Sequence, residues 1–251
     1  MIYRITGFLL LIETAMLLCC GGVSLLYHED DLISFLQSAS LGMLPFYLSG
    51  YIPSITNAFF ETMSGFSSTG ATILNDIEKL PHGLLFWRSM TQWIGGLGIV
   101  FFTIAVLPIF GVGGIQVFAA EASGPTHDKV HPRIGITAKW IWGIYAGLTG
   151  TLIILLMFGG MNIFDSICHA FATTSTGGFS TKQASIEYYH SPYIEYVISI
   201  FMFISGINFT LLLLFVNGKL KKFVHDAELK WYFWSVTGFT IVIAAILYYN
   251  S

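Results

Sequence analysis

Two short polar runs, rich in glycine, serine and threonine, contain the residues of this sequence best suited to chemistry. The first, SGFSSTGATIL, begins at Ser64, and the second, TTSTGGFSTKQ, begins at Thr173. Glycine permits backbone conformations in which successive carbonyl oxygens point in one direction. A ring of such oxygens replaces the water shell of a cation in potassium-channel selectivity filters. Neither run contains an acidic residue, so we expect the backbone, and not carboxylates, to bind a cation here.

The two runs belong to an internal repeat. An offset of 108 residues aligns NAFFETMSGFSSTGAT, which begins at Asn57, with DSICHAFATTSTGGFS, which begins at Asp165, and places Gly70 on Gly178. In each copy a short amphipathic segment precedes the polar run. We predict a half-helix in each segment, at residues 57–66 and 164–174.

These half-helices would reach about 15 Å at 1.5 Å per residue, which is half of a hydrocarbon core. Asn57 and Asp165 stand where N-cap residues are expected. A chain that stops at mid-membrane must turn back, and irregular backbone at that depth is tolerated only when buried in protein or lining a water-filled cavity. We therefore interpret each polar run as a filter hairpin. The partly negative end of each half-helix would also favour a cation.

Composition places this chain in a membrane. It is 55% hydrophobic and 10% charged, whereas soluble domains carry roughly 25% charged residues. The spacing of the three cysteines supports neither a zinc site nor a disulfide framework, and a net charge of −3 does not suggest a nucleic-acid partner. Five segments are long and apolar enough to span a bilayer: Ile5–Tyr27, Leu84–Ile109, Lys139–Phe158, Tyr193–Val216 and Trp231–Tyr249.

Basic residues indicate the orientation. Eight of the eleven Lys and Arg residues lie at Arg4, in residues 118–139 and in residues 217–230, which the positive-inside rule assigns to the cytoplasm. The N-terminus is then cytoplasmic, and both hairpins face outside. The segment Asp31–Gly50 contains Pro45 and would reverse this orientation if it crossed. We therefore expect it to be interfacial or re-entrant.

The predicted fold is an all-α integral membrane protein built from tandem pore repeats. Each repeat has the order helix, half-helix, filter hairpin, helix, as in potassium channels, with about five spanning helices and two re-entrant half-helices in all. The predicted regions are an N-terminal membrane helix and irregular segment (1–50), pore repeat one (51–117), a cytoplasmic loop (118–138), pore repeat two (139–217), and a second loop with the first helix of an incomplete third repeat (218–251).

Three stretches, AFFETMSGFSSTGATIL, LPHGLLFWRSMTQWIGGLGIV and CHAFATTSTGGFSTKQASI, resemble the Trk/Ktr/HKT superfamily of potassium transporters, and within it the TrkH-type membrane subunit. The resemblance covers residues 52–251. It implies four repeats around one pore, each contributing one filter glycine. The filter residues that it implies here are Ser68, Thr69, Gly70, Thr176, Gly177 and Gly178, with potassium at the backbone carbonyls of Thr69, Gly70, Gly177 and Gly178.

The resemblance also implies partners and a location. Potassium would be the transported substrate, without a cofactor, in a multi-pass protein of the bacterial inner membrane. Subunits of the family pair as homodimers and dock on a cytosolic nucleotide-binding regulatory subunit. Since only two of the four repeats are recognisable here, two interpretations stay open: two chains assemble a complete filter, or the chain is a truncated product that inserts without conducting.

Two rival functions have weaker support. An intramembrane hydrolase needs a base beside its nucleophile, but His169 precedes the Ser/Thr cluster in the chain and its repeat counterpart is Glu61; we therefore expect no enzyme. A transporter of inverted repeats does not fit two hairpins on the same side.

For the remaining polar and small residues, Glu61, Asp165 and His169 could be functional or structural. Arg88 is predicted to be an interfacial anchor. The glycines predicted to permit close helix packing are Gly95, Gly96, Gly98 and Gly206.

Overall fold

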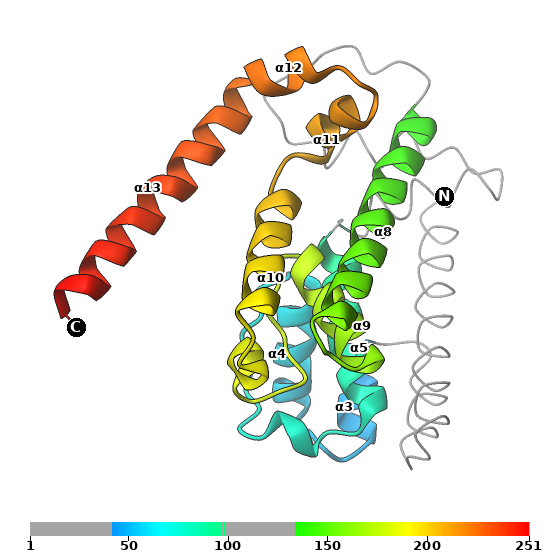
Figure 1. Ribbon diagram of the computed structural model, residues 1–251. Helices are drawn as coiled ribbons and strands as arrows, with labels where there is room; N and C mark the ends of the chain where they lie inside the picture. The colour runs from blue at the N-terminus through cyan, green and yellow to red at the C-terminus, as the bar shows by residue number, and fades with distance from the viewer. Residues whose placement is uncertain (1–41, 97, 99–133, 251) are drawn as a thin grey trace. The chain divides into compact units, whose positions relative to one another are not determined.

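The computed structural model describes residues 42–96, 98 and 134–250, and these residues form helices, turns and loops without a strand (Figure 1). The α-helices are α3 (Leu44–Leu48), α4 (Ile55–Phe66), α5 (His82–Gly96), α8 (Ile134–Phe158), α9 (Ile163–Thr174), α10 (Pro192–Ser205), α11 (Phe209–Val216), α12 (Leu220–His225) and α13 (Ala227–Asn250). Two short 3₁₀ helices span Ile77–Lys79 and Ser185–Tyr189. The chain divides into two compact units between Met202 and Phe203.

The two predicted half-helices are present as α4 and α9. Each has 12 residues, and each begins and ends 108 residues from its counterpart, so the repeat in the sequence is also a repeat of helices. The predicted N-caps were wrong, because both caps lie three residues earlier in the chain. Ser54 caps α4 by accepting the amide of Asn57 at 3.4 Å, and Asn162 caps α9 by accepting the amide of Asp165 at 2.8 Å.

The first unit is organised around α5. This helix contacts α4 on one side and α9 on another, and α9 in turn contacts α8 (Figure 1). The core between α4 and α5 contains the fully buried side chains of Leu84 and Trp87. A second apolar cluster joins α8, α9 and α10. As a consequence, the two half-helices lie on either side of α5 in one packed body.

Two described helices are long and apolar enough to cross a membrane, at Trp140–Phe158 and Ala227–Tyr249. They correspond to the predicted spans Lys139–Phe158 and Trp231–Tyr249. The predicted span Ile5–Tyr27 lies outside the described residues, as does the part of Leu84–Ile109 after Gly98. Of the segment Asp31–Gly50, the structure describes the last nine residues, which include α3.

The predicted span Tyr193–Val216 is not one continuous helix. It is divided into α10 and α11 by a turn at Gly206, Ile207 and Asn208. Glycine lowers helix propensity, and asparagine favours the start of a new helix. The carbonyl of Asn208 accepts the amides of Leu211 and Leu212 at 2.9 and 3.2 Å, which starts α11.

Candidate ion-filter site

The chain that follows each half-helix has the same backbone in both copies. We call residues 67–73 hairpin one and residues 175–181 hairpin two. Ser68 and Thr176 have φ angles of 52° and 54°, and Gly70 and Gly178 have φ angles of 74° and 92°. Such left-handed angles are uncommon for residues other than glycine. Their recurrence at matching positions makes the turn itself part of the repeat.

Hydrogen bonds tie each hairpin to the end of its half-helix. In hairpin one the amide of Thr69 donates to the carbonyl of Ser64 at 3.0 Å. In hairpin two the amide of Gly177 donates to the carbonyl of Ala172 at 2.8 Å, which is the matching bond. The C-terminal end of each helix carries partial negative charge, so both hairpins begin where a cation is favoured.

The two hairpins touch at their glycines. A Cβ atom added to Gly70 would overlap the carbonyl oxygen of Gly177 and lie 3.0 Å from its carbonyl carbon. A Cβ added to Gly178 would meet no atom within 4 Å. The structure thus brings predicted filter residues from both repeats together, although the two glycines have different surroundings.

The other predicted filter residues occupy the turns themselves. The hydroxyl of Ser68 donates to the carbonyl of Gln92 at 3.4 Å. The hydroxyl of Thr69 lies 2.7 Å from that of Ser67, and the hydroxyl of Thr176 donates to the carbonyl of Ser175 at 2.7 Å. These side chains therefore bond within the hairpins and to α5.

Behind hairpin one lies a buried ion pair. Glu61 of α4 is 0% exposed and Arg88 of α5 is 2% exposed. The Nε of Arg88 donates to Glu61 Oε1 at 2.7 Å. The same carboxylate accepts the hydroxyl of Thr72 at 2.8 Å and the amide of Ile73 at 3.2 Å. Glu61 therefore holds the returning segment of hairpin one against α4.

Arg88 connects this pair to hairpin two. Its Nη1 donates to the carbonyl of Ser180 at 2.9 Å, and its guanidinium lies 3.7 Å from the centre of the Phe179 ring, a cation–π contact. The prediction that Arg88 is an interfacial anchor was wrong. Its side chain faces a carboxylate and a carbonyl that come from two different repeats, and these neutralise and bond it inside the protein.

His169 occupies in α9 the place that Glu61 has in α4. Its Nε2 lies 2.9 Å from the hydroxyl of Ser180, the counterpart of Thr72, and its Nδ1 lies 2.8 Å from the carbonyl of Asp165. The hydroxyl of Ser180 also accepts the amide of Lys182 at 3.0 Å. In each repeat a buried side chain, Glu61 or His169, therefore bonds to the returning segment of the hairpin. These contacts give both residues a structural role.

Asp165 also holds hairpin two in place. Its carboxylate accepts the hydroxyl of Thr181 at 2.6 Å and the side-chain amide of Asn162 at 2.8 Å. Sequence reasoning left the roles of Glu61, Asp165 and His169 open, and in the structure all three bond to the chain around the hairpins.

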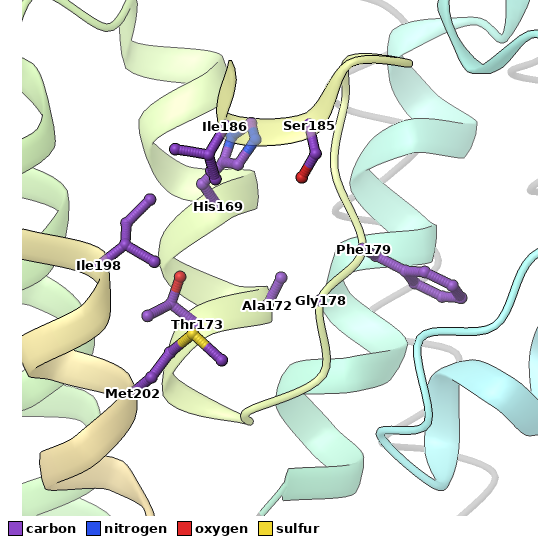
Figure 2. Close-up of a pocket in the computed structure, with 9 residues that line it drawn as sticks. All are labelled: His169, Ala172, Thr173, Gly178, Phe179, Ser185, Ile186, Ile198 and Met202. Atoms are coloured by element: carbon purple, nitrogen blue, oxygen red, sulfur yellow. The ribbon is translucent and has the colours of Figure 1, made fainter. Parts of the chain in front are cut away.

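A cavity of about 150 Å³ lies between α9, hairpin two and α10. Figure 2 shows its lining, which is mostly apolar and includes His169, Thr173, Ile198 and Met202.

In the other repeat the counterpart of Thr173 is Gly65, and a Cβ added there would lie 3.6 Å from the ring of Phe179. The phenyl ring of hairpin two thus packs against the first repeat.

Sequence reasoning missed two residues of this site, Gln92 and Phe179. Gln92 is fully buried on α5, and its side-chain oxygen accepts the amide of Phe179 at 3.1 Å. The available signal was a glutamine inside a predicted membrane span, at a position whose counterpart in the second repeat is the apolar Ile200.

Comparisons with known proteins find relatives of this chain. The family model described as "TrkH: Cation transport protein" matches residues 31–247. The Trk system potassium uptake protein TrkH of Escherichia coli K12 is 44% identical over 215 residues, which cover 84% of this chain and 44% of that protein. The protein of the same name from Vibrio parahaemolyticus is 44% identical over 174 residues, covering 68% of this chain and 36% of that one.

The crystal structure of the potassium transporter TrkH from Vibrio parahaemolyticus is similar in fold. It aligns with a TM-score of 0.73 and 32% sequence identity, covering 90% of this chain and 54% of the other. The chain therefore spans about half the length of that structure, and 44% of the length of the relative from Escherichia coli.

Proposed function

Because this chain belongs to the TrkH family of cation transport proteins, we propose that it is a membrane subunit that passes potassium ions through a filter of backbone carbonyls. The observation that carries the proposal is the contact between Gly70 and Gly177, which puts segments of two repeats side by side. Relatives named as potassium uptake proteins support the choice of ion.

The proposed mechanism uses the backbone. Carbonyl oxygens of Thr69, Gly70, Gly177 and Gly178 replace the hydration shell of potassium, and the C-terminal ends of α4 and α9 stabilise its charge. Potassium is the transported substrate, and the step needs no cofactor and no covalent chemistry. A membrane potential drives entry, with about 2.3 kcal/mol per elementary charge for each 100 mV.

We place the protein in the bacterial inner membrane with a cytoplasmic N-terminus and both hairpins outside. Four lysine residues that follow α11, the last of them in α13, support this orientation: Lys219, Lys221, Lys222 and Lys230. This basic segment is our candidate contact for a cytosolic nucleotide-binding regulatory subunit.

The unequal exposure of α4 and α9 supports an assembly of more than two repeats. On α9, Cys168 is 1% exposed and contacts Ser89 of α5. The counterpart of Cys168 on α4 is Phe60, which is 44% exposed. The face that α9 buries against α5 is therefore uncovered on α4.

The matching helices α5 and α10 also differ in exposure, and here the helix of the second repeat is the exposed one. Arg88 and Gln92 of α5 are buried against hairpin two, whereas their counterparts on α10 are Tyr196, 71% exposed, and Ile200, 55% exposed. The chain thus has two uncovered faces. The face on α4 corresponds to the one that α9 buries against α5, and the face on α10 corresponds to the one that α5 buries against α9 and hairpin two. We propose that a second copy covers them, so that a homodimer supplies four repeats.

A disulfide test checks this dimer. In a chain whose native cysteines are replaced by serine, Phe60→Cys and Val197→Cys occupy the positions that match Cys168 and Ser89. We expect oxidation in the membrane to yield a dimer of twice the monomer mass on a non-reducing gel. Ser89→Cys with native Cys168 is the control, which should link within one chain. If the control forms its disulfide while the chain with Phe60→Cys and Val197→Cys stays monomeric, the proposed homodimer is wrong.

Growth rescue tests the proposed transport. A potassium-uptake-deficient bacterium that expresses this chain should grow at low external potassium. At matched membrane expression the Gly70→Ser variant should lose that growth, and the Gly178→Ser variant should grow more slowly than the parent. Failure of the well-inserted parent to restore growth would favour the alternative, a truncated membrane fragment that does not conduct.

A further inference from the structure

We propose that Gln92 of α5 is a positioning residue that holds the two hairpins in register and thereby sets discrimination between potassium and sodium. The inference deepens the proposed function and rests on it, since selectivity has meaning only for a filter that conducts. Gln92 is 0% exposed, lies on a helix between both half-helices, and need not touch the ion to act.

Gln92 bonds to both hairpins. Its side-chain oxygen accepts the amide of Phe179 in hairpin two at 3.1 Å. Its backbone carbonyl accepts the hydroxyl of Ser68 in hairpin one at 3.4 Å. One residue thus anchors chain segments that lie more than a hundred positions apart, and each anchor is next to a residue of the proposed filter.

The amide of Gln92 also packs against the glycines. A Cβ added to Gly177 would lie 2.6 Å from both Nε2 and Oε1 of Gln92, and a Cβ added to Gly70 would lie 3.6 Å from Nε2. The side chain therefore occupies the space beside Gly177 that a larger residue there would need. Movement of either hairpin toward α5 meets this amide.

The donor side of the same amide is unsatisfied. Nε2 of Gln92 is buried and has no hydrogen-bond partner, although most buried polar groups are paired. A leucine would fill this place without an unpaired group. The amide has one partner that a leucine would lose, because its oxygen bonds to Phe179. That bond fixes the direction of the backbone immediately after Gly178.

The repeat does not supply a second such anchor. The counterpart of Gln92 is Ile200, an apolar and half-exposed residue of α10. Within the described residues, Gln92 therefore joins hairpin one to hairpin two through its two hydrogen bonds. Ile200, at the matching position of the second repeat, has no side-chain amide to make such a bond. Potassium selectivity depends on the number and placement of carbonyl dipoles, so a loosened junction should admit sodium.

The test compares Gln92→Leu, which removes the acceptor, with Gln92→Glu, which keeps an acceptor for the Phe179 amide. Ser89→Ala is the matched control, because it removes a buried hydroxyl of α5 that donates to the carbonyl of Leu85 at 3.1 Å. Hydrogen–deuterium exchange of the purified full chain reports on the amide of Phe179. Ion flux into vesicles with potassium or sodium gradients reports on selectivity.

We expect Gln92→Leu to speed exchange at Phe179 by about tenfold or more and to lower the potassium-to-sodium flux ratio by about tenfold, the effect of 1.4 kcal/mol. Gln92→Glu should keep exchange near the parent value, and Ser89→Ala should change neither quantity.

Unchanged exchange in Gln92→Leu overturns the positioning role, whatever the flux. Faster exchange with an unchanged flux ratio in a conducting chain overturns the selectivity role and leaves the proposed function standing. A parent without potassium flux overturns the proposed function and the selectivity role with it, while the exchange result still decides whether Gln92 positions hairpin two.

Discussion

Gly70→Ala is expected to abolish potassium uptake, whereas Gly178→Ala is expected to leave part of it. Both residues have left-handed φ angles, 74° and 92°, and a side chain there costs about 1–2 kcal/mol. At Gly70 the added methyl group would also overlap the carbonyl oxygen of Gly177, a backbone atom that cannot turn away. Overpacking adds about 1–3 kcal/mol and displaces an oxygen of the proposed filter.

The measurement is potassium uptake together with the thermal unfolding midpoint of the purified protein. We expect a total loss of stability of about 2–5 kcal/mol for Gly70→Ala. Gly143→Ala is the control, because a Cβ at this position in α8 meets no atom within 4 Å and its backbone is helical. If Gly70→Ala and Gly178→Ala reduced uptake and stability equally, the contact between Gly70 and the carbonyl of Gly177 would not explain why Gly70 must be a glycine.

Arg88→Met is expected to destabilise the protein by about 3–5 kcal/mol, because it leaves the carboxylate of Glu61 buried without its cation. It also removes the bond from Arg88 to the carbonyl of Ser180, so hairpin two should loosen. Glu61→Gln should cost a similar amount, because it leaves the buried guanidinium of Arg88 without its counter-charge, although the new amide can still accept the hydroxyl of Thr72.

A double-mutant cycle separates these contributions. The variant that carries both Arg88→Met and Glu61→Gln should be more stable than the sum of the single losses, with stability measured by thermal unfolding of the purified chain.

The control is the exposed pair of Lys79 and Asp76, whose nitrogen and oxygen lie 2.6 Å apart. The hydrogen bond to Asp76, and then its charge, raise the pKa of Lys79. Lys79→Ala should leave stability unchanged within error, because solvent screens exposed pairs. If Arg88→Met unfolds at the parent temperature, the buried pair does not hold the hairpins together.

Local features of the fold could be predicted well from the sequence. Chain composition indicated a membrane protein, and the offset between Gly70 and Gly178 located two half-helices and two turns to within a few residues. Cap identity was harder: Ser54 and Asn162, and not Asn57 and Asp165, begin the helices. All four are residue types that favour an N-cap, so residue type alone does not distinguish them.

The sequence by itself determined the half-helices and the polar runs that follow them, because each depends on residues within about one helix length of one another. The repeat was visible because two such local patterns recur at one offset. Only the tertiary structure decided what lies behind the hairpins. Arg88 contacts Glu61, 27 positions away, and Ser180, 92 positions away. An arginine near a predicted membrane boundary can face lipid headgroups or protein, and the choice depends on whether a carboxylate and a carbonyl from other segments converge on it.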